Sequence, residues 1–203
     1  MASVQQAQGV AQFNDKEKAA IQKAINEARN FVANNDNAKP TQEQLVKVTG
    51  VMTNAQSRTI MHDKTHEWKG HFIVKPPNTI GGKTTGDHFV HMGANWQGQL
   101  PVVVGSKAAV VYITMDKMHP GLGYLLAWDK PENSSNGTSK IYVEAGNSAK
   151  FVKMDWNEIE KKLDASCNTS FHFDPETGAM AGGEIKDSDK NATIGAIFDR
   201  RGA

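Results

Sequence analysis

Histidine is the residue type in this sequence whose spacing could best support chemistry at a site. Five of the seven histidines lie between residues 62 and 91. Imidazole is the commonest side-chain ligand of zinc and copper, so converging rings would form a metal site. His62 and His66 are four residues apart and share a face of a strand or a helix. The predicted metal ligands are His62, His66, His88 and His91.

The alternative is that these histidines are half-exposed strand and turn residues with no common ligand. Asp63, Glu67 and Asp87 could add a carboxylate, but no His-Glu-x-x-His spacing is present. The sequence leaves both interpretations open. It predicts no cofactor other than this divalent metal ion.

The four tryptophans divide according to their neighbours in the sequence. Trp128 lies in an apolar run and Trp156 on the apolar side of a predicted helix, so both are expected in the core. Trp68 and Trp96 lie among polar residues and glycines, where an indole could stack on a ligand. With His71, these two tryptophans are the predicted ligand-binding residues.

The sequence contains no pattern that predicts catalysis. Residues 81–85 resemble the end of a phosphate-binding loop, but Pro77 occupies the position of its first glycine and no helix pattern follows. Cys167 has no paired base in the sequence, and neither a Ser-His-Asp order nor a cofactor fingerprint stands out. We therefore predict a protein that is not an enzyme.

Charge and hydropathy narrow the class of protein further. The chain has 203 residues and a net charge of +1, which excludes a strongly basic nucleic-acid binder. No stretch approaches the ~20 apolar residues of a membrane-spanning helix. Because the N-terminus lacks the apolar segment of a secretory signal and there is only one cysteine, we expect a cytoplasmic protein.

Two helices are predicted at positions that would flank a β domain. Asn14 or Asp15 can cap a helix to about Val32, in which Ile21, Ile25 and Ala28 recur at helical spacing. A short helix is expected at residues 155–165, capped by Asp155, with Trp156, Ile159 and Leu163 on its apolar side. This helix would lie across the sheets.

The rest of the chain follows a strand pattern. Strands are predicted at residues 45–52, 58–68, 88–92, 107–114, 123–129, 140–145 and 192–199, although Thr41 and Gln44 leave a capped helix open for the first. Short strands separated by turns indicate an antiparallel β-sandwich or barrel, and we favour the sandwich. We therefore expect a mainly β fold, with residues 1–40 as a helical extension and residues 41–203 as the sandwich domain.

Motifs along residues 41–200 resemble the plant jasmonate-induced protein family. The matching motifs are Trp68-x-Gly70-His71, the loop at 76–82, Ala109-Val110-Val111-Tyr112, Leu125-Leu126-Ala127-Trp128-x-x-Pro131, Ile141-Tyr142-Val143-Glu144 and the helix of Trp156. The resemblance implies a cytosolic plant stress or defence protein. It implies no catalytic residues.

The order of elements is also similar, more remotely, to the actinoporin-like β-sandwiches, which include pore-forming toxins and fungal fruit-body lectins. The chain departs from the toxins near Pro131 and Asn147, where Asn, Ser and Gly replace an aromatic cluster. Our leading hypothesis is a non-enzymatic binding protein for a carbohydrate or a lipid headgroup. The alternatives are a metal-binding protein or metalloenzyme and a membrane-active pore former, and the oligomeric state stays open.

Overall fold

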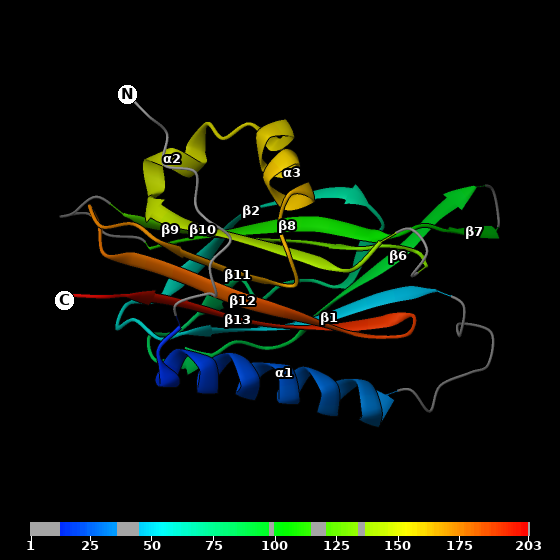
Figure 1. The fold of residues 1–203 in the computed structure, drawn as a ribbon, viewed down its shortest axis with the longest axis horizontal. Helices are drawn as coiled ribbons and strands as arrows, with labels where there is room; N and C mark the ends of the chain where they lie inside the picture. The colour runs from blue at the N-terminus through cyan, green and yellow to red at the C-terminus, as the bar shows by residue number, and fades with distance from the viewer. Residues whose placement is uncertain (1–12, 36–44, 98–99, 115–120, 134–136, 203) are drawn as a thin grey trace.

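A computed structural model describes residues 13–35, 45–97, 100–114, 121–133 and 137–202 of the chain. Within these ranges the chain forms two packed β-sheets with helices outside both of them (Figure 1). The alternative helix cap at Thr41 and Gln44 lies outside the described residues.

Two sheets and three helices make up the described fold. The helices are α1 (Asp15–Asn35), α2 (Ser148–Val152) and α3 (Trp156–Asp164). Sheet A contains β1 (Val46–Asn54), β3 (His71–Val74), β5 (Thr84–Thr85), β6 (Phe89–Gln97), β7 (Leu100–Val103), β11 (Thr169–Phe173), β12 (Ala179–Ser188) and β13 (Asn191–Arg200). Sheet B contains β2 (Ile60–Lys69), β4 (Thr79–Ile80), β8 (Ser106–Thr114), β9 (Leu122–Lys130) and β10 (Lys140–Asn147).

The strand order confirms the predicted β-sandwich and corrects one part of it. Sheet A has the order β11-β12-β13-β1-β6-β3, with β5 beside β1 and β7 beside β6, and sheet B has the order β10-β9-β8-β2-β4. The pair β1 and β13 runs parallel, with Val48 opposite Ala192, so the expectation of a purely antiparallel sheet is wrong there. These two strands lie at opposite ends of the chain, and nothing local in the sequence sets their relative direction.

The main core lies between the two sheets. Alternate residues of each strand point inward, as the pleat requires, and Val110, Leu126 and Trp128 of sheet B meet Val48 and Phe198 of sheet A in one buried cluster. The Trp128 ring stacks on Phe89 at 5.1 Å and donates from Nε1 to Ser106. Trp128 is therefore a core anchor, as its sequence neighbours predict.

Side chains satisfy the hydrogen-bonding groups where the edge of one sheet meets the other. On β10, the backbone N–H of Val143 donates to Ser170 Oγ, and that of Ala145 donates to His172 Nδ1. Burial is the largest influence on the pKa of His172 and lowers it, which favours the neutral ring that can accept this bond. Side-chain acceptors at a strand edge also block pairing with another chain.

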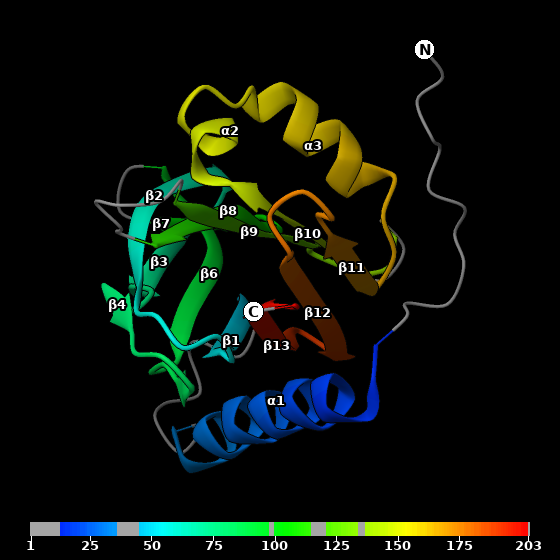
Figure 2. The ribbon, with the colours of Figure 1, turned by 90° about the vertical axis from the view of Figure 1, so that its left-hand side faces the viewer.

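Helix α1 lies along the outer face of sheet A (Figure 2). Ile21, Ile25 and Ala28 are buried, which confirms the helical face predicted from their spacing, and Val32 is half-buried. A Cβ atom at Gly195 of β13 would lie 2.4 Å from the carbonyl oxygen of Ile21. The helix therefore approaches the strand closely because this position has no side chain.

Helices α2 and α3 cover the outer face of sheet B, on the opposite side of the sandwich (Figure 2). Phe151, Ile159 and Leu163 of the helices pack on an apolar patch formed by Ala109, Val111, Leu125 and Ala127. Asp155 caps α3, as predicted, by accepting from the backbone N–H of Asn157 at 2.8 Å. Trp156 packs against this cluster but is only half-buried, so it is less enclosed than expected.

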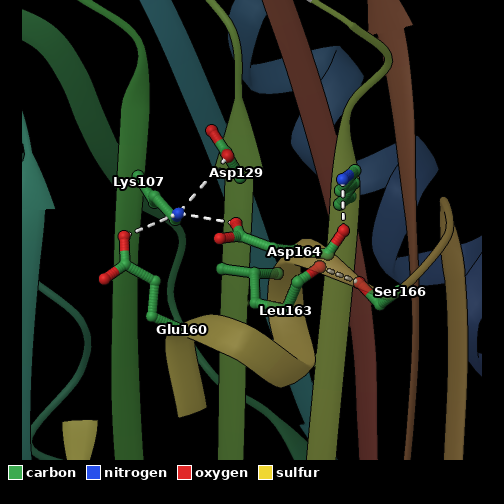
Figure 3. Close-up of polar contacts among 7 residues, drawn as sticks. Lys107, Asp129, Glu160, Leu163, Asp164 and Ser166 are labelled. Carbon is green, nitrogen blue, oxygen red and sulfur yellow. Dashed lines mark hydrogen bonds and ion pairs between the residues drawn. The ribbon is translucent and has the colours of Figure 1, made fainter. Parts of the chain in front are cut away.

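A nearly buried lysine ties α3 to sheet B (Figure 3). Lys107 Nζ lies 2.8 Å from Glu160, 2.7 Å from Asp164 and 3.7 Å from Asp129, and its side chain is 6% exposed. Burial lowers the pKa of Lys107, but the hydrogen bonds to Asp164 and Glu160 and the charge of Asp129 outweigh burial and raise it overall. The lysine is therefore charged at neutral pH.

Candidate functional site

The strand β2 carries two of the predicted metal ligands on opposite faces. A register shift lies between His62 and Lys64, so His62 is opposite Tyr112 while Lys64 is opposite Val111. The His62 ring contacts Tyr112 on the inner side and bonds Thr65 at 2.8 Å. The expectation that His62 and His66 share a face is wrong, because one extra residue in a strand reverses the side of every residue after it.

His88 and His91, the other two predicted ligands, also have separate surroundings. His88 stacks on Phe31 of α1 with ring centroids 3.5 Å apart. His91 is fully buried, and its Nδ1 lies 2.8 Å from Ser106 Oγ. In the described ranges, no group of three or more His, Cys, Asp or Glu side chains is arranged to hold a metal ion. The structure does not bring the four histidines together.

His91 is a neutral histidine of the core. Burial, together with a smaller effect of the nearby His71, lowers its pKa to about 3. Its Nε2 lies 3.4 Å from Glu67 Oε1 and has no hydrogen-bond partner among the described residues. Glu67 also accepts from the backbone N–H of Phe72, so this carboxylate links β2 to the edge strand β3.

Two of the three predicted ligand-binding residues, Trp68 and His71, lie in different sheets. Trp68 is half-buried on the outer face of sheet B, whereas His71 lies on β3 of sheet A and its Nδ1 is 3.0 Å from the carbonyl oxygen of Ala94. Trp96 belongs to β6, and its side chain lies outside the described residues. Of these residues, Trp68 lies beside other aromatic side chains.

Trp68 belongs to an aromatic cluster between β2 and the start of α3. His66 stacks on Trp156 at 4.6 Å with an angle of 12°, and it meets Trp68 edge-on at 4.7 Å. Burial lowers the pKa of His66, although the charges of Glu160 and Glu67 oppose this. His66 and the two indoles therefore form a half-buried aromatic cluster, in which Trp68 stands nearly perpendicular to the two stacked rings.

An exposed apolar surface lies on the same outer face of sheet B. Val152, the last residue of α2, is 65% exposed, the highest value among the large hydrophobic side chains of the described residues. Met61 of β2 is 36% exposed and lies opposite Ile113, which packs under the helices. We call the combined surface the β2–α2 face, formed by Met61, Lys64, His66, Trp68, Val152 and Trp156.

Lysines border this apolar surface. Lys64 Nζ donates to the carbonyl oxygen of Phe151 at 2.9 Å and to that of Val152 at 3.4 Å, which satisfies the C-terminal carbonyls of α2. Lys64 is also 3.4 Å from Asp63, whereas the exposed Lys153, directly after Val152, has no ion-pair partner among the described residues. The β2–α2 face therefore places an apolar side chain beside a cation.

Sequence reasoning found Trp68 and His66 but missed Met61, Lys64 and Val152. The helix α2 has only five residues, which is too short for a helical period to stand out. One signal was available, because Asn147 precedes the helix and accepts from the backbone N–H of Ala149 as an N-cap. None of the helices in the described ranges is long and apolar enough to cross a bilayer.

These features define a class of protein: a β-sandwich flanked by helices on both outer faces, with an apolar and aromatic surface as its candidate site. Comparison with known proteins then gives the family. The chain belongs to the Nakanori-like protein family, whose family model matches residues 4–200.

Two relatives match nearly the whole chain. A jasmonate-induced protein homologue of Atriplex canescens is 27% identical over 188 residues, which cover 92% of this chain and 94% of that protein. The resemblance inferred from sequence motifs is thereby confirmed. The crystal structure of the lipid binding protein Nakanori superimposes with a TM-score of 0.65 at 21% identity and covers 95% of this chain and 90% of that chain. This second likeness is one of fold.

Proposed function

We propose that this chain is a non-enzymatic protein that binds lipid headgroups at a membrane surface through its β2–α2 face. The observation that carries the proposal is the exposed Val152, which lies at the end of a helix beside Lys153, a cation with no ion-pair partner in the part of the chain that the structure describes. An apolar side chain can enter the headgroup boundary while a neighbouring lysine meets lipid phosphate.

The aromatic cluster supports this proposal. Tryptophan rings favour the interface between water and lipid, because one side of the ring is apolar and the N–H is polar. Trp68 and Trp156 lie 6.0 Å apart at an angle of 84° and are both half-buried. They lie on the same side of the sandwich as Val152, so all three side chains could meet one flat surface together.

The comparisons support the ligand class. The chain shares its fold with a protein described as lipid binding, and its curated relative is described as jasmonate-induced. A stress-related role in the cytoplasm, as the sequence suggests, would expose the protein to the cytoplasmic leaflets of membranes, which are rich in anionic lipids. Lys64 and Lys153 would then add attraction that weakens with salt.

Sedimentation with vesicles tests the proposal. We expect the purified chain to pellet with vesicles of phosphatidylcholine and phosphatidylserine. Val152→Glu should weaken binding by about tenfold, because burial of a valine side chain contributes ~1.5 kcal/mol or more and each ~1.4 kcal/mol is a factor of ten. The matched control is Ile73→Glu, since Ile73 is 49% exposed but lies on the edge strand β3.

If Val152→Glu and Ile73→Glu bind vesicles equally well, the membrane contact does not lie on the β2–α2 face. No sedimentation with either zwitterionic or anionic vesicles would contradict the lipid proposal itself. Dye-loaded vesicles extend the assay to the pore-forming alternative, and we expect binding without dye release.

Carbohydrate is a second candidate ligand, and the pair Trp68 and Trp156 is the observation that favours it. Aromatic faces can stack on the apolar side of a sugar ring. A glycan array distinguishes the two ligand classes, and we expect Trp156→Ala to abolish any glycan signal while Val152→Glu leaves it unchanged. Glycan binding without vesicle binding would replace the lipid proposal.

A further inference from the structure

A groove lies between the start of α1 and the strands β11 and β12, on the side of the sandwich opposite the β2–α2 face. Its volume is about 430 Å³, within the ~300–1,000 Å³ of small-molecule sites. Phe13, Ala19 and Ile21 provide apolar lining, and Lys18, Gln22, Thr169 and Glu184 provide polar lining.

A glycine and an aromatic pair shape the apolar part of the groove. Phe13 lies over Gly182 of β12, where a Cβ atom would be 2.3 Å from the Phe13 ring. The same ring meets Phe171 of β11 edge-on at 5.4 Å. Phe13 is thus fixed as a wall of the groove and remains half-buried.

Some charged residues around the groove have partners and one does not, among the residues that the structure describes. Glu184 lies 3.4 Å from Lys186, and Lys186 Nζ also donates to Gln22 Oε1 at 2.9 Å. Lys18 is exposed, and its side chain has no hydrogen-bond or ion-pair partner among the described residues. The groove therefore combines an apolar lining with one lysine that a bound anion could pair with.

We propose that this groove binds a single-chain amphiphile with an anionic head, such as a fatty acid anion. The alkyl chain lies against Phe13 and Ile21, and the head pairs with Lys18. This is a second site, distinct from the β2–α2 face, and it does not depend on the proposed membrane contact.

Titration with decanoate, kept below its micelle concentration, tests the proposal by NMR. Saturable shifts are expected at amides of the first turns of α1 and of β11 and β12. Lys18→Gln should weaken decanoate binding by about threefold, the size expected of one exposed ion pair. The neutral analogue 1-decanol should bind the wild type more weakly and should not respond to this substitution.

Two further variants complete the experiment. Lys16→Gln is the matched control, because Lys16 is exposed on the same helix and does not line the groove, and its affinity for decanoate should match the wild type. Ala19→Phe fills the groove from an exposed helix position and should abolish binding of decanoate and 1-decanol alike. Its own α1 amides report whether the helix stays folded.

Three results would overturn the proposal: no saturable shifts at these amides, equal weakening by Lys18→Gln and Lys16→Gln, or shifts confined to the β2–α2 face. A change of oligomeric state in Ala19→Phe without decanoate binding by the wild type would assign the groove to a second copy of the chain and would also overturn it. Vesicle sedimentation by Ala19→Phe should match the wild type, which keeps this outcome separate from the membrane proposal.

Discussion

The two outer faces of the sandwich hold their helices by different physical means. On sheet A, the long α1 packs through Ile21 and Ile25 on the strand that carries Gly195, and through Ala28 on β1, so the fit depends on shape. On sheet B, the short helices α2 and α3 add charged groups to their apolar contacts, and Lys107 is nearly buried among three carboxylates.

The charged contact of α1 lies in its first turn, by contrast. Arg201 pairs with both carboxylate oxygens of Glu17, which is buried and also completes a capping box with Asn14. The difference teaches that helix length determines what docking requires. A long helix buries enough apolar surface to be held by shape, whereas helices of five and nine residues also need charged contacts.

The largest effect that we expect in this comparison comes from Lys107→Ala. Removal of the lysine leaves Asp129, Glu160 and Asp164 close together without a counter-charge, which should lower the free energy of unfolding by about 3 kcal/mol. Urea denaturation measures it. Lys161→Ala, an exposed position on the same helix, should change stability by less than ~0.5 kcal/mol. If Lys107→Ala and Lys161→Ala destabilise the protein equally, charged contacts do not hold α3 on sheet B.

A slightly smaller loss is expected from Gly195→Ala on the other face. The added methyl would lie 2.4 Å from the Ile21 carbonyl oxygen and 2.7 Å from Ile25 Cγ1, so α1 must shift. Overpacking of this kind costs about 2 kcal/mol, and faster amide exchange should appear in α1 but not in α3. Gly81→Ala is the control, because its nearest neighbour is the flexible Thr84 side chain at 3.3 Å. Unchanged exchange in α1 would contradict docking by shape.

Arg201→Ala should cost about 1.5 kcal/mol, because it removes charge-assisted hydrogen bonds to a buried carboxylate. A double-mutant cycle with Glu17→Gln isolates the pair, and we expect a positive coupling energy in urea denaturation. Additive losses would show that the two ends of the chain are held independently of each other.

Acid should weaken the packing of α2 on sheet B, and we expect this to be the smallest effect in the series. Burial raises the pKa of Glu144, but the hydrogen bond and charge of Lys150, the charge of Lys162 and a bond from Tyr142 lower it overall. A depressed carboxyl pKa contributes stability that is present above the ordinary value of 4.5 and is lost as the pH falls through the folded value.

Urea denaturation from neutral pH to well below the ordinary value of 4.5 follows this loss. Glu144→Gln should reduce the slope of stability against pH, whereas Glu158→Gln, an exposed carboxyl on α3, should leave it unchanged. The same slope in both variants would mean that Glu144 is not the titrating group.

The candidate site was less predictable than the elements that carry it. Trp68 and His66 stood out by residue type, but their contact with Trp156 joins β2 to a helix far along the chain. His91 has the same residue type as His66 and yet is a buried, neutral core residue. Residue type indicates which chemistry a side chain can perform, whereas its burial and its neighbours determine whether that chemistry is available.

The sequence alone determined the period of each long element. It determined the apolar face of α1, the Asp155 cap of α3 and the buried strands around Val110 and Leu126, because these follow from local spacing and local hydrogen bonding. It also indicated the sandwich, since alternating strands need a second layer to cover them.

Only the tertiary structure decided which residues meet. The small residues of β12 gave no strand pattern, although they form a strand of ten residues. The register shift after His62 places His66 on the outer face, and β13 pairs parallel with β1. Each of these outcomes depends on a partner strand far away in the chain. Strand pairing is non-local, so register and sheet order, and with them the two sites proposed for this chain, arise when the layers pack.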